Sequence, residues 1–232
     1  MGEFSKIEWT THTFNPVIGC MKVGPGCDGC YAEAMMDHRY GRVQWGAPGK
    51  GVGARVKTSP ANWRKPLAWN RDAAGREEPT YVFCASLADV FDNAWEPEWR
   101  ADLFDLIAQT PRLTWLLLTK RPQNIVAMSM AAGGLPKNAA IGATMVTQAE
   151  YDRDRMKLFV AAQIVRPAFT FGSFEPLLGP IILDSYAPDW IIVGGETDQG
   201  KHRAREADPA WFRDMRDQAA RLVGVEEGEV HP

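Results

Sequence analysis

Residues 15–35 read NPVIGCMKVGPGCDGCYAEAM and hold three of the four cysteines of this 232-residue chain, Cys20, Cys27 and Cys30. Their spacing is C-x6-C-x2-C, between a short apolar run and a segment with helical character, Tyr31–Arg39. We therefore expect a strand, a cysteine loop and a helix in succession. In a parallel α/β fold this order places the loop at the carboxyl edge of a strand, where active sites lie.

Three clustered thiols are typical of a metal site. Three thiolates on one loop can occupy three corners of a cubane iron–sulfur cluster, whereas complete ligation by protein takes four cysteines. Glycines 24, 26 and 29 let the loop turn tightly and bring backbone N–H groups near the sulfurs. Two alternatives remain open. One is a structural zinc ion with His12 or His38 as fourth ligand, although neither gives the paired spacing of a zinc finger. The other is thiols that bind no metal.

The rest of the chain alternates between short apolar runs and amphipathic segments, which indicates parallel βαβ units. Strands are expected just before Cys20 and at Tyr81–Leu87, Thr114–Thr119, Ala139–Met145, Ala168–Phe174 and Trp190–Gly194. Helices are expected at Pro97–Gln109, Gln123–Ala131, Thr147–Gln163 and Asp208–Leu222. The strand runs are apolar on both faces, as in parallel sheets covered by helices. Pattern alone leaves both an open doubly wound sheet and a partial barrel possible. Cys84, inside an apolar run, is typical of a small buried residue.

Residues 41–80 are rich in Gly, Pro, Lys and Arg and show little periodicity, so we expect an irregular insertion within one domain spanning residues 1–232. Cations interleaved with Trp63 and Trp69 resemble a nucleic-acid contact surface, the alternative being a solvated loop. These cations are Lys50, Arg55, Lys57, Arg64, Lys65 and Arg71. Tryptophans in such segments are more typical of packing anchors than of base-stacking platforms. This interpretation applies to Trp63, Trp69, Trp95 and Trp99.

The overall composition is that of an ordinary globular protein, with 45% apolar and 24% charged residues. A formal net charge of −3 argues against a protein that coats nucleic acid by bulk charge, but it allows a local basic groove. We expect no membrane span, because no run of about 18 apolar residues occurs. The first residues lack the apolar core of a secretory signal, so we expect a cytoplasmic protein. Clustered cysteines in that compartment favour metal binding or catalysis over disulfides.

The strand, the three-cysteine loop and the βα units together resemble the radical S-adenosylmethionine superfamily, whose usual cysteine spacing is C-x3-C-x2-C. A closer resemblance covers almost the whole chain. The segments FNPVIGC, GPGCDGCYAE, SLADVF, LLLTKRP, FEPLLGP and DWIIVGGE are similar to a phage- and prophage-associated three-cysteine-motif family of unknown function, which is regarded as radical S-adenosylmethionine-like. Relatives continue into an apolar segment after the last helix. Here the chain ends in GVEEGEVHP, and we expect a final strand to be missing or replaced.

The resemblance implies a parallel (β/α)6 partial TIM-type barrel in which Cys20, Cys27 and Cys30 hold a [4Fe-4S] cluster. The open iron would bind S-adenosylmethionine. One electron from a flavodoxin- or ferredoxin-like reductase would cleave it to methionine and a 5′-deoxyadenosyl radical that abstracts hydrogen. We hypothesise a nucleotide or a modified base in phage DNA as substrate, in the host cytoplasm if the protein is phage-encoded. The alternatives are a radical enzyme acting on a peptide or small metabolite, and a zinc-stabilised nucleic-acid-binding module without catalysis.

The ends of the expected strands supply the remaining candidates for the site. Lys120, Arg121 and Glu175 are the candidate catalytic residues. The cation pair suits a carboxylate or phosphate, and the glutamate is held extended by the proline that follows it. The candidate cofactor-binding residues are Ser86, Asp89, Lys120, Thr144, Ser173, Glu175, Gly194, Gly195 and Glu196. The alternative roles for these side chains are helix caps, turn carboxylates and structural ion pairs.

Overall fold

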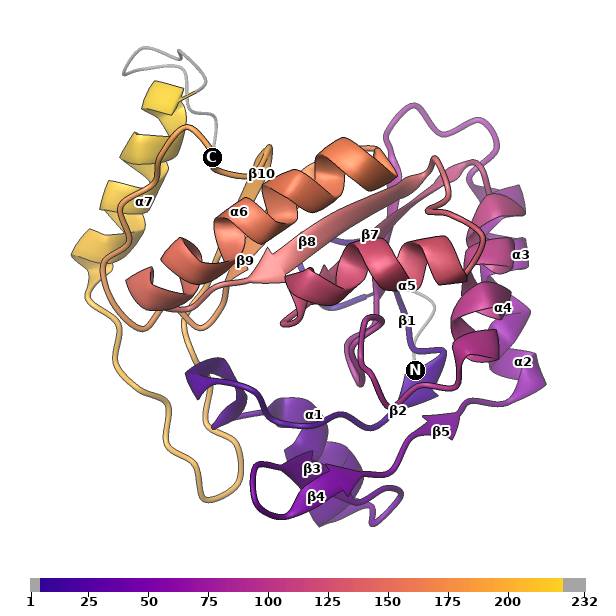
Figure 1. Ribbon diagram of the computed structural model, residues 1–232, viewed down its shortest axis with the longest axis horizontal. Coiled ribbons are helices and arrows are strands. Elements are labelled where there is room, and N and C mark those ends of the chain that lie inside the picture. Colours follow the sequence, from indigo (N-terminus) through magenta and orange to yellow (C-terminus); the bar gives the residue numbers. More distant parts are fainter. Residues whose placement is uncertain (1–4, 223–232) are drawn as a thin grey trace.

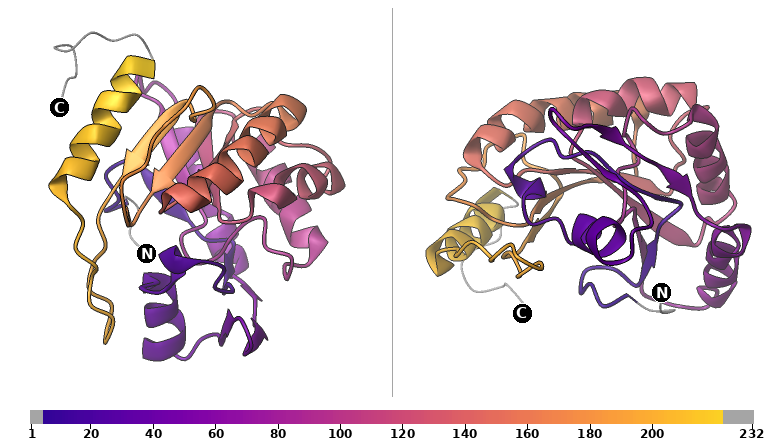
Figure 2. Two further views of the ribbon diagram at one scale, coloured as in Figure 1. Left: turned by 60° about the vertical axis from the view of Figure 1, so that its left-hand side comes forward. Right: turned by 90° about the horizontal axis from the view of Figure 1, so that it is seen from below.

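The computed structural model describes residues 5–222 (Figure 1). Six strands form one sheet in which every pair of neighbours is parallel. In spatial order, which is also chain order, they are β1 (His12–Phe14), β6 (Thr80–Cys84), β7 (Leu113–Thr119), β8 (Ala139–Thr144), β9 (Thr170–Phe174) and β10 (Trp190–Val193). A doubly wound sheet reverses its strand order at a switch point. The uninterrupted order and the curled sheet (Figure 2) confirm the predicted partial barrel.

The helices that follow the strands pack on the outer side of the curled sheet (Figure 2). They are α4 (Pro97–Ala108), the short η3 (Pro122–Asn124) with α5 (Ile125–Ala131), α6 (Gln148–Val165) and α7 (Pro209–Leu222). The predicted helices are confirmed with ends shifted by a few residues. Thr147 caps α6 by accepting a hydrogen bond from the Glu150 N–H at 3.3 Å, as the sequence predicts.

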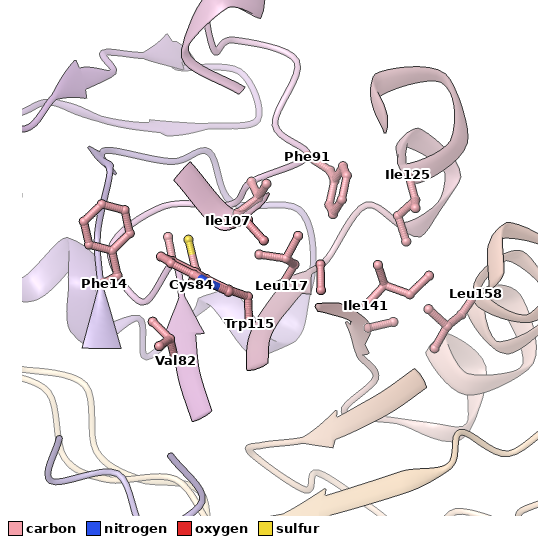
Figure 3. Packing of buried hydrophobic residues seen from close by; sticks show 14 of the residues in the cluster. Phe14, Val82, Cys84, Phe91, Ile107, Trp115, Leu117, Ile125, Ile141 and Leu158 are labelled. Atoms are coloured by element: carbon pink, nitrogen blue, oxygen red, sulfur yellow. The ribbon is translucent and has the colours of Figure 1, made fainter. Parts of the chain in front are cut away.

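Both faces of the sheet are buried. On the outer side Phe14, Val82, Trp115 and Leu117 pack with helix residues (Figure 3). Successive side chains of a strand point to opposite faces, so Leu116, between Trp115 and Leu117, lies on the inner side. There it joins a second cluster that is rich in aromatic rings. The partly buried members of that cluster are Trp9, Tyr81, Leu118, Phe169 and Trp190. The two-sided burial explains why the strand runs read as continuous apolar stretches.

The N-terminal segment differs from the prediction. The expected strand just before Cys20 is β2 (Val17–Ile18), which is not part of the main sheet but pairs antiparallel with β5 (Val56–Lys57). The edge strand of the sheet, β1, ends earlier, because Pro16 has no N–H to donate to a ladder. Asn15 instead accepts a hydrogen bond from the Leu87 N–H at 2.7 Å, which turns the chain across the strand ends.

After the cysteines come α1 (Tyr31–Glu33) and η2 (Ala34–Arg39), a π-helical continuation. This N-terminal segment lies below the sheet in Figure 1.

Residues 41–80 are more regular than predicted. They contain an antiparallel pair, β3 (Trp45–Ala47) and β4 (Gly51–Gly53), followed by β5 and two short helices, α2 (Pro60–Trp63) and α3 (Lys65–Asp72). Gly46 and Gly53, which make this stretch resemble a loop, are required by the pairing of β3 with β4. A Cβ on Gly46 would lie 2.2 Å from the Val52 carbonyl oxygen. Trp45 packs with Ile18 and Met36 in a small cluster of its own.

The tryptophans of this segment pack against the core and do not form a base-stacking platform. Trp69 is buried and stacks on His12 with ring centroids 4.4 Å apart, so it cannot stack on a base. Trp63 packs against the core edge-on to Phe14, and Trp95 is buried. These tryptophans are packing anchors, as the alternative interpretation predicts. Five of the six cations are exposed: Lys50, Lys57, Arg64, Lys65 and Arg71.

Among the described residues, no helix is long and apolar enough to cross a membrane. The predicted change of the final strand concerns residues 224–232 and lies outside the part of the chain that the structure describes.

Candidate active site at the carboxyl edge of the sheet

A cavity of about 460 Å³ opens at the carboxyl ends of the strands and is lined by all three loop cysteines. Its volume falls in the range of about 300–1,000 Å³ that small-molecule sites occupy. Among the sequence candidates it brings together Ser86, Asp89, Lys120, Thr144, Ser173, Glu175, Gly195 and Glu196. The apolar part of the lining includes Trp9, Phe83 and Leu118. The polar groups therefore gather around the cysteines because parallel strands end at one edge.

The cysteine loop is packed closely against two other strand exits. A Cβ on Gly24 would lie 2.5 Å from Glu150 Oε1, and one on Gly26 would lie 2.9 Å from Val146 Cγ1, both beyond β8. A Cβ on Gly29 would lie 2.6 Å from Glu196 Oε1 beyond β10. Real side chains do not approach this closely, so a Cβ at any of these three positions would force a neighbouring side chain or the loop to shift. The loop glycines thus fix the position of the thiols.

The thiols lie in a desolvated environment. Burial, reinforced by the negative charge of Asp89, raises the pKa of Cys20 to about 12, although the Arg121 guanidinium opposes the shift. Burial also raises the pKa of Cys30. Without a metal these two thiols hold their protons at neutral pH, and metal binding must displace them. Cys84 is fully buried in β6 and does not line the cavity, in keeping with its predicted packing role.

Arg121 faces the cysteine loop. Its Nη1 lies 2.8 Å from Asp89 Oδ2 and 3.8 Å from Cys20 Sγ, and its Nη2 donates to the Met21 carbonyl oxygen at 2.9 Å. Asp89 also accepts hydrogen bonds from Thr119 Oγ1 at 2.7 Å and from the Lys120 N–H at 3.0 Å. Both charged side chains are 7% exposed. The geometry favours the structural alternative for this pair, which anchors the cysteine loop to the exits of β6 and β7.

The polar wall opposite consists of side chains with fewer protein partners. Lys120 Nζ lies 3.3 Å from Thr144 Oγ1, and Ser173 Oγ donates to Glu175 Oε2 at 3.3 Å. Burial raises the pKa of Glu175. Gly194 lies beside the cavity and makes room for this carboxyl, because a Cβ there would be 2.5 Å from Glu175 Oε1. A cation and a carboxyl group on one wall can hold a ligand that carries both charges.

Glu196 has a partner that the sequence did not indicate. Arg205 donates from Nε to Glu196 Oε2 at 2.8 Å and from Nη2 to Oε1 at 2.6 Å, and these bonds lower the pKa of Glu196 to about 2. The same guanidinium donates to the Pro25 carbonyl oxygen at 3.0 Å and to Asp28 at 3.2 Å. His202 Nε2 lies 3.1 Å from Glu196 Oε1. Glu196 therefore helps tie the cysteine loop to the segment after β10. Arg205 belongs to none of the sequence motifs, so the sequence alone did not identify it.

The donor set fits a cluster with one open iron. Within residues 5–222 no three His, Cys, Asp or Glu side chains lie close enough to hold one metal ion. A cubane cluster does not need its ligands to meet at one ion, because each thiolate binds a separate iron at a separate corner. All three cysteines line one cavity, with the cations of Lys120 and Arg121 beside them. His12 and His38, the proposed fourth zinc ligands, are not among its lining residues.

The packing of the loop predicts the effect of Gly29→Ala. The added methyl would collide with Glu196 and His202, so the loop must move outward and expose its thiols. We expect Cys27 and Cys30 of the metal-free protein to react several-fold faster with a thiol reagent than in the wild type. Gly179→Ala is the matched control, because its Cβ meets nothing within 4 Å. Equal labelling rates in all three proteins would show that the loop does not depend on this contact.

Fold and site together define a class: a parallel six-stranded partial barrel with a three-cysteine loop at its carboxyl mouth. The chain belongs to the family described as "Protein of unknown function (DUF5131)", whose model matches residues 4–225. A search of curated proteins found no match. The phage association suggested by the motifs stays a prediction.

The structure is similar to that of a spore photoproduct lyase mutant with bound AdoMet and dinucleoside spore photoproduct. The TM-score is 0.50 at 11% sequence identity, and the match covers 97% of this chain and 55% of that chain. The chain thus spans about half the length of the lyase. The likeness supports the partial-barrel fold.

Proposed function

We propose that this protein is a radical S-adenosylmethionine enzyme in which Cys20, Cys27 and Cys30 ligate a [4Fe-4S] cluster. The observation that carries the proposal is that all three cysteines line one cavity of small-molecule size at the mouth of a partial barrel. When bound, the cluster and S-adenosylmethionine supply reductive cleavage of the sulfonium and a radical that abstracts hydrogen. The protein supplies binding, orientation and the exclusion of water.

The chain's own residues divide this work. Lys120 and Glu175 offer a cation and a carboxyl group that suit the amino-acid end of S-adenosylmethionine. Burial raises the pKa of Glu175, so this carboxyl group loses its proton at higher pH than an exposed glutamate. Trp9, Phe83 and Leu118 form an apolar part of the lining that keeps water from the reacting atoms. Arg121 holds the cysteine loop at the Met21 carbonyl oxygen, and Arg205 holds it at the Pro25 carbonyl oxygen.

For the substrate we propose a nucleotide or a base in DNA, with a flavodoxin- or ferredoxin-like reductase as electron donor. Support comes from the exposed cations of residues 50–71 and from the basic cavity described below. A peptide or a small metabolite is the competing substrate class. A zinc-stabilised binding module is the competing non-enzymatic function.

The test uses protein purified without oxygen and reconstituted with iron and sulfide. We expect reduced protein to convert S-adenosylmethionine to 5′-deoxyadenosine and methionine, measured by liquid chromatography. Label from S-adenosylmethionine or from the radical should then be followed into DNA, RNA and nucleotides. Cleavage of S-adenosylmethionine with no change in DNA, RNA or nucleotides would contradict the substrate proposal and favour a peptide or metabolite. A colourless protein with one zinc, no sulfide and no cleavage would establish the binding module instead.

A further inference from the structure

A second cavity of about 440 Å³ lies beside the cysteine cavity. Met21 and Lys120 line both, so these two residues form part of the wall between them. The remaining lining comes from segments far apart in sequence and includes Arg55, Asp92, Arg121, Gln123, Arg153 and Lys157. The cavity therefore lies where the cysteine loop, the 51–55 segment, the exits of β6 and β7, and α6 meet.

The lining is strongly basic. Five cations from three segments line the cavity: Arg55, Lys120, Arg121, Arg153 and Lys157. Arg55 and Arg121 are 3% and 7% exposed and are paired with carboxylates, so the charge open to a ligand comes from the other three. Asp92 is the one lining carboxylate among the described residues, and its side chain is 4% exposed and lies 2.6 Å from Arg55 Nη2.

The other carboxylates that pair with these cations have little exposed surface. Asp154 accepts a hydrogen bond from Lys157 Nζ at 2.8 Å and also pairs with Arg153. Its side chain is 2% exposed, whereas the side chains of Arg153 and Lys157 are 51% and 37% exposed. Asp89, the partner of Arg121, is 7% exposed. Glu150, 3.9 Å from Arg153 and 11% exposed, accepts from the Val146 N–H. The cations of α6 thus face solvent while their counter-charges are shielded.

We propose that this second cavity binds a phosphate group of the substrate, so that the substrate is a nucleotide or a nucleic-acid strand. Guanidinium forks and an ammonium group are the side chains that recognise phosphate oxygens in proteins. A basic cavity of about 440 Å³ suits a compact anion better than an extended acidic peptide. Lys120, shared by both cavities, would place the nucleoside attached to that phosphate next to the cysteine loop. The assignment of a substrate rests on the proposed function, but phosphate binding does not.

Two variants test the site by fluorescence anisotropy with a labelled single-stranded oligonucleotide. Gln123→Glu introduces a carboxylate at an exposed lining position without removing any cation. We expect it to weaken binding by about fivefold. Arg153→Gln/Lys157→Gln removes two charges and keeps hydrogen-bond donors for Asp154. We expect it to reduce the slope of log affinity against log salt by about 1.4. The matched control, Arg213→Gln/Arg216→Gln on α7, removes the same charge from exposed positions and should leave binding unchanged.

Competition identifies the source of the phosphate. Displacement of the oligonucleotide by a mononucleotide assigns the cavity to free nucleotides. Displacement by unlabelled strand alone assigns it to nucleic acid. Equal binding by the wild type, Gln123→Glu and the α6 double variant would overturn the proposal, and so would displacement by poly-glutamate but by no phosphate compound. The assay needs no turnover, so a failure here alongside intact S-adenosylmethionine cleavage would leave the proposed function standing.

Discussion

Replacing Cys27 by alanine should abolish cluster binding. After anaerobic reconstitution we expect iron to fall from about four atoms per chain to background, because two remaining thiolates cannot hold three corners of a cubane. Cys27 closes the short 3-10 turn Pro25–Cys27 and is one of the three cysteines that line the cavity. Iron and acid-labile sulfide content, with the visible absorption of the reconstituted protein, measure the effect.

Cys84→Ala is the control for that experiment. Cys84 is as completely buried as any residue of β6, yet it does not line the cavity, so its variant should keep full iron content. Far-UV circular dichroism should show that Cys27→Ala retains its fold, because the barrel core does not depend on the loop for its packing. Global unfolding of Cys27→Ala together with loss of a bound zinc would instead support the structural-zinc alternative.

Asp89→Asn should be the most destabilising single change at the rim of the barrel. It leaves the Arg121 guanidinium, 7% exposed, without the charge 2.8 Å away and with Asp92, at 4.0 Å, as its remaining carboxylate partner among the described residues. Removing one partner of a buried pair lowers the free energy of unfolding by about 3–5 kcal/mol. Urea unfolding followed by fluorescence measures this. The matched control is Asp102→Asn, whose partner Lys57 is at the surface and whose own side chain is 54% exposed. There the expected cost is about 0–1 kcal/mol, and equal costs in the two variants would contradict the account.

Much of the fold could be predicted from the sequence because the strands are buried on both faces. Runs such as Thr114–Thr119 therefore read as apolar throughout, and amphipathic helices separate them. The positions of the site residues followed from one rule, that parallel strands end at a common edge. Ser86, Lys120, Thr144 and Ser173 line one cavity for that reason.

The chemical role of individual charges could not be predicted in the same way, because it depends on partners remote in sequence. Asp89 and Arg121 were candidates for binding ligand, yet each is engaged by the other, and Arg121 also holds the cysteine loop. Glu196 is held by Arg205, which no pattern singled out. The second cavity went unnoticed because Arg153 and Lys157 resemble ordinary surface cations of a helix.

The short elements were missed for a different reason. Strand β1 has three residues and β2 and β5 have two each, too few to show a period. The pairing of β2 with β5 joins residues almost 40 positions apart along the chain. Gly46 of β3 and Gly53 of β4, which resemble loop signals, are instead required where the two strands approach closely.

The central claim is that Cys20, Cys27 and Cys30 hold a cluster with one iron open to S-adenosylmethionine. The most direct test is the EPR spectrum of the anaerobically reconstituted, reduced protein with and without S-adenosylmethionine, alongside its metal and sulfide content. The account predicts about four irons and four sulfides per chain and a spectrum that changes when S-adenosylmethionine is added. One zinc per chain, no sulfide and no signal would contradict it.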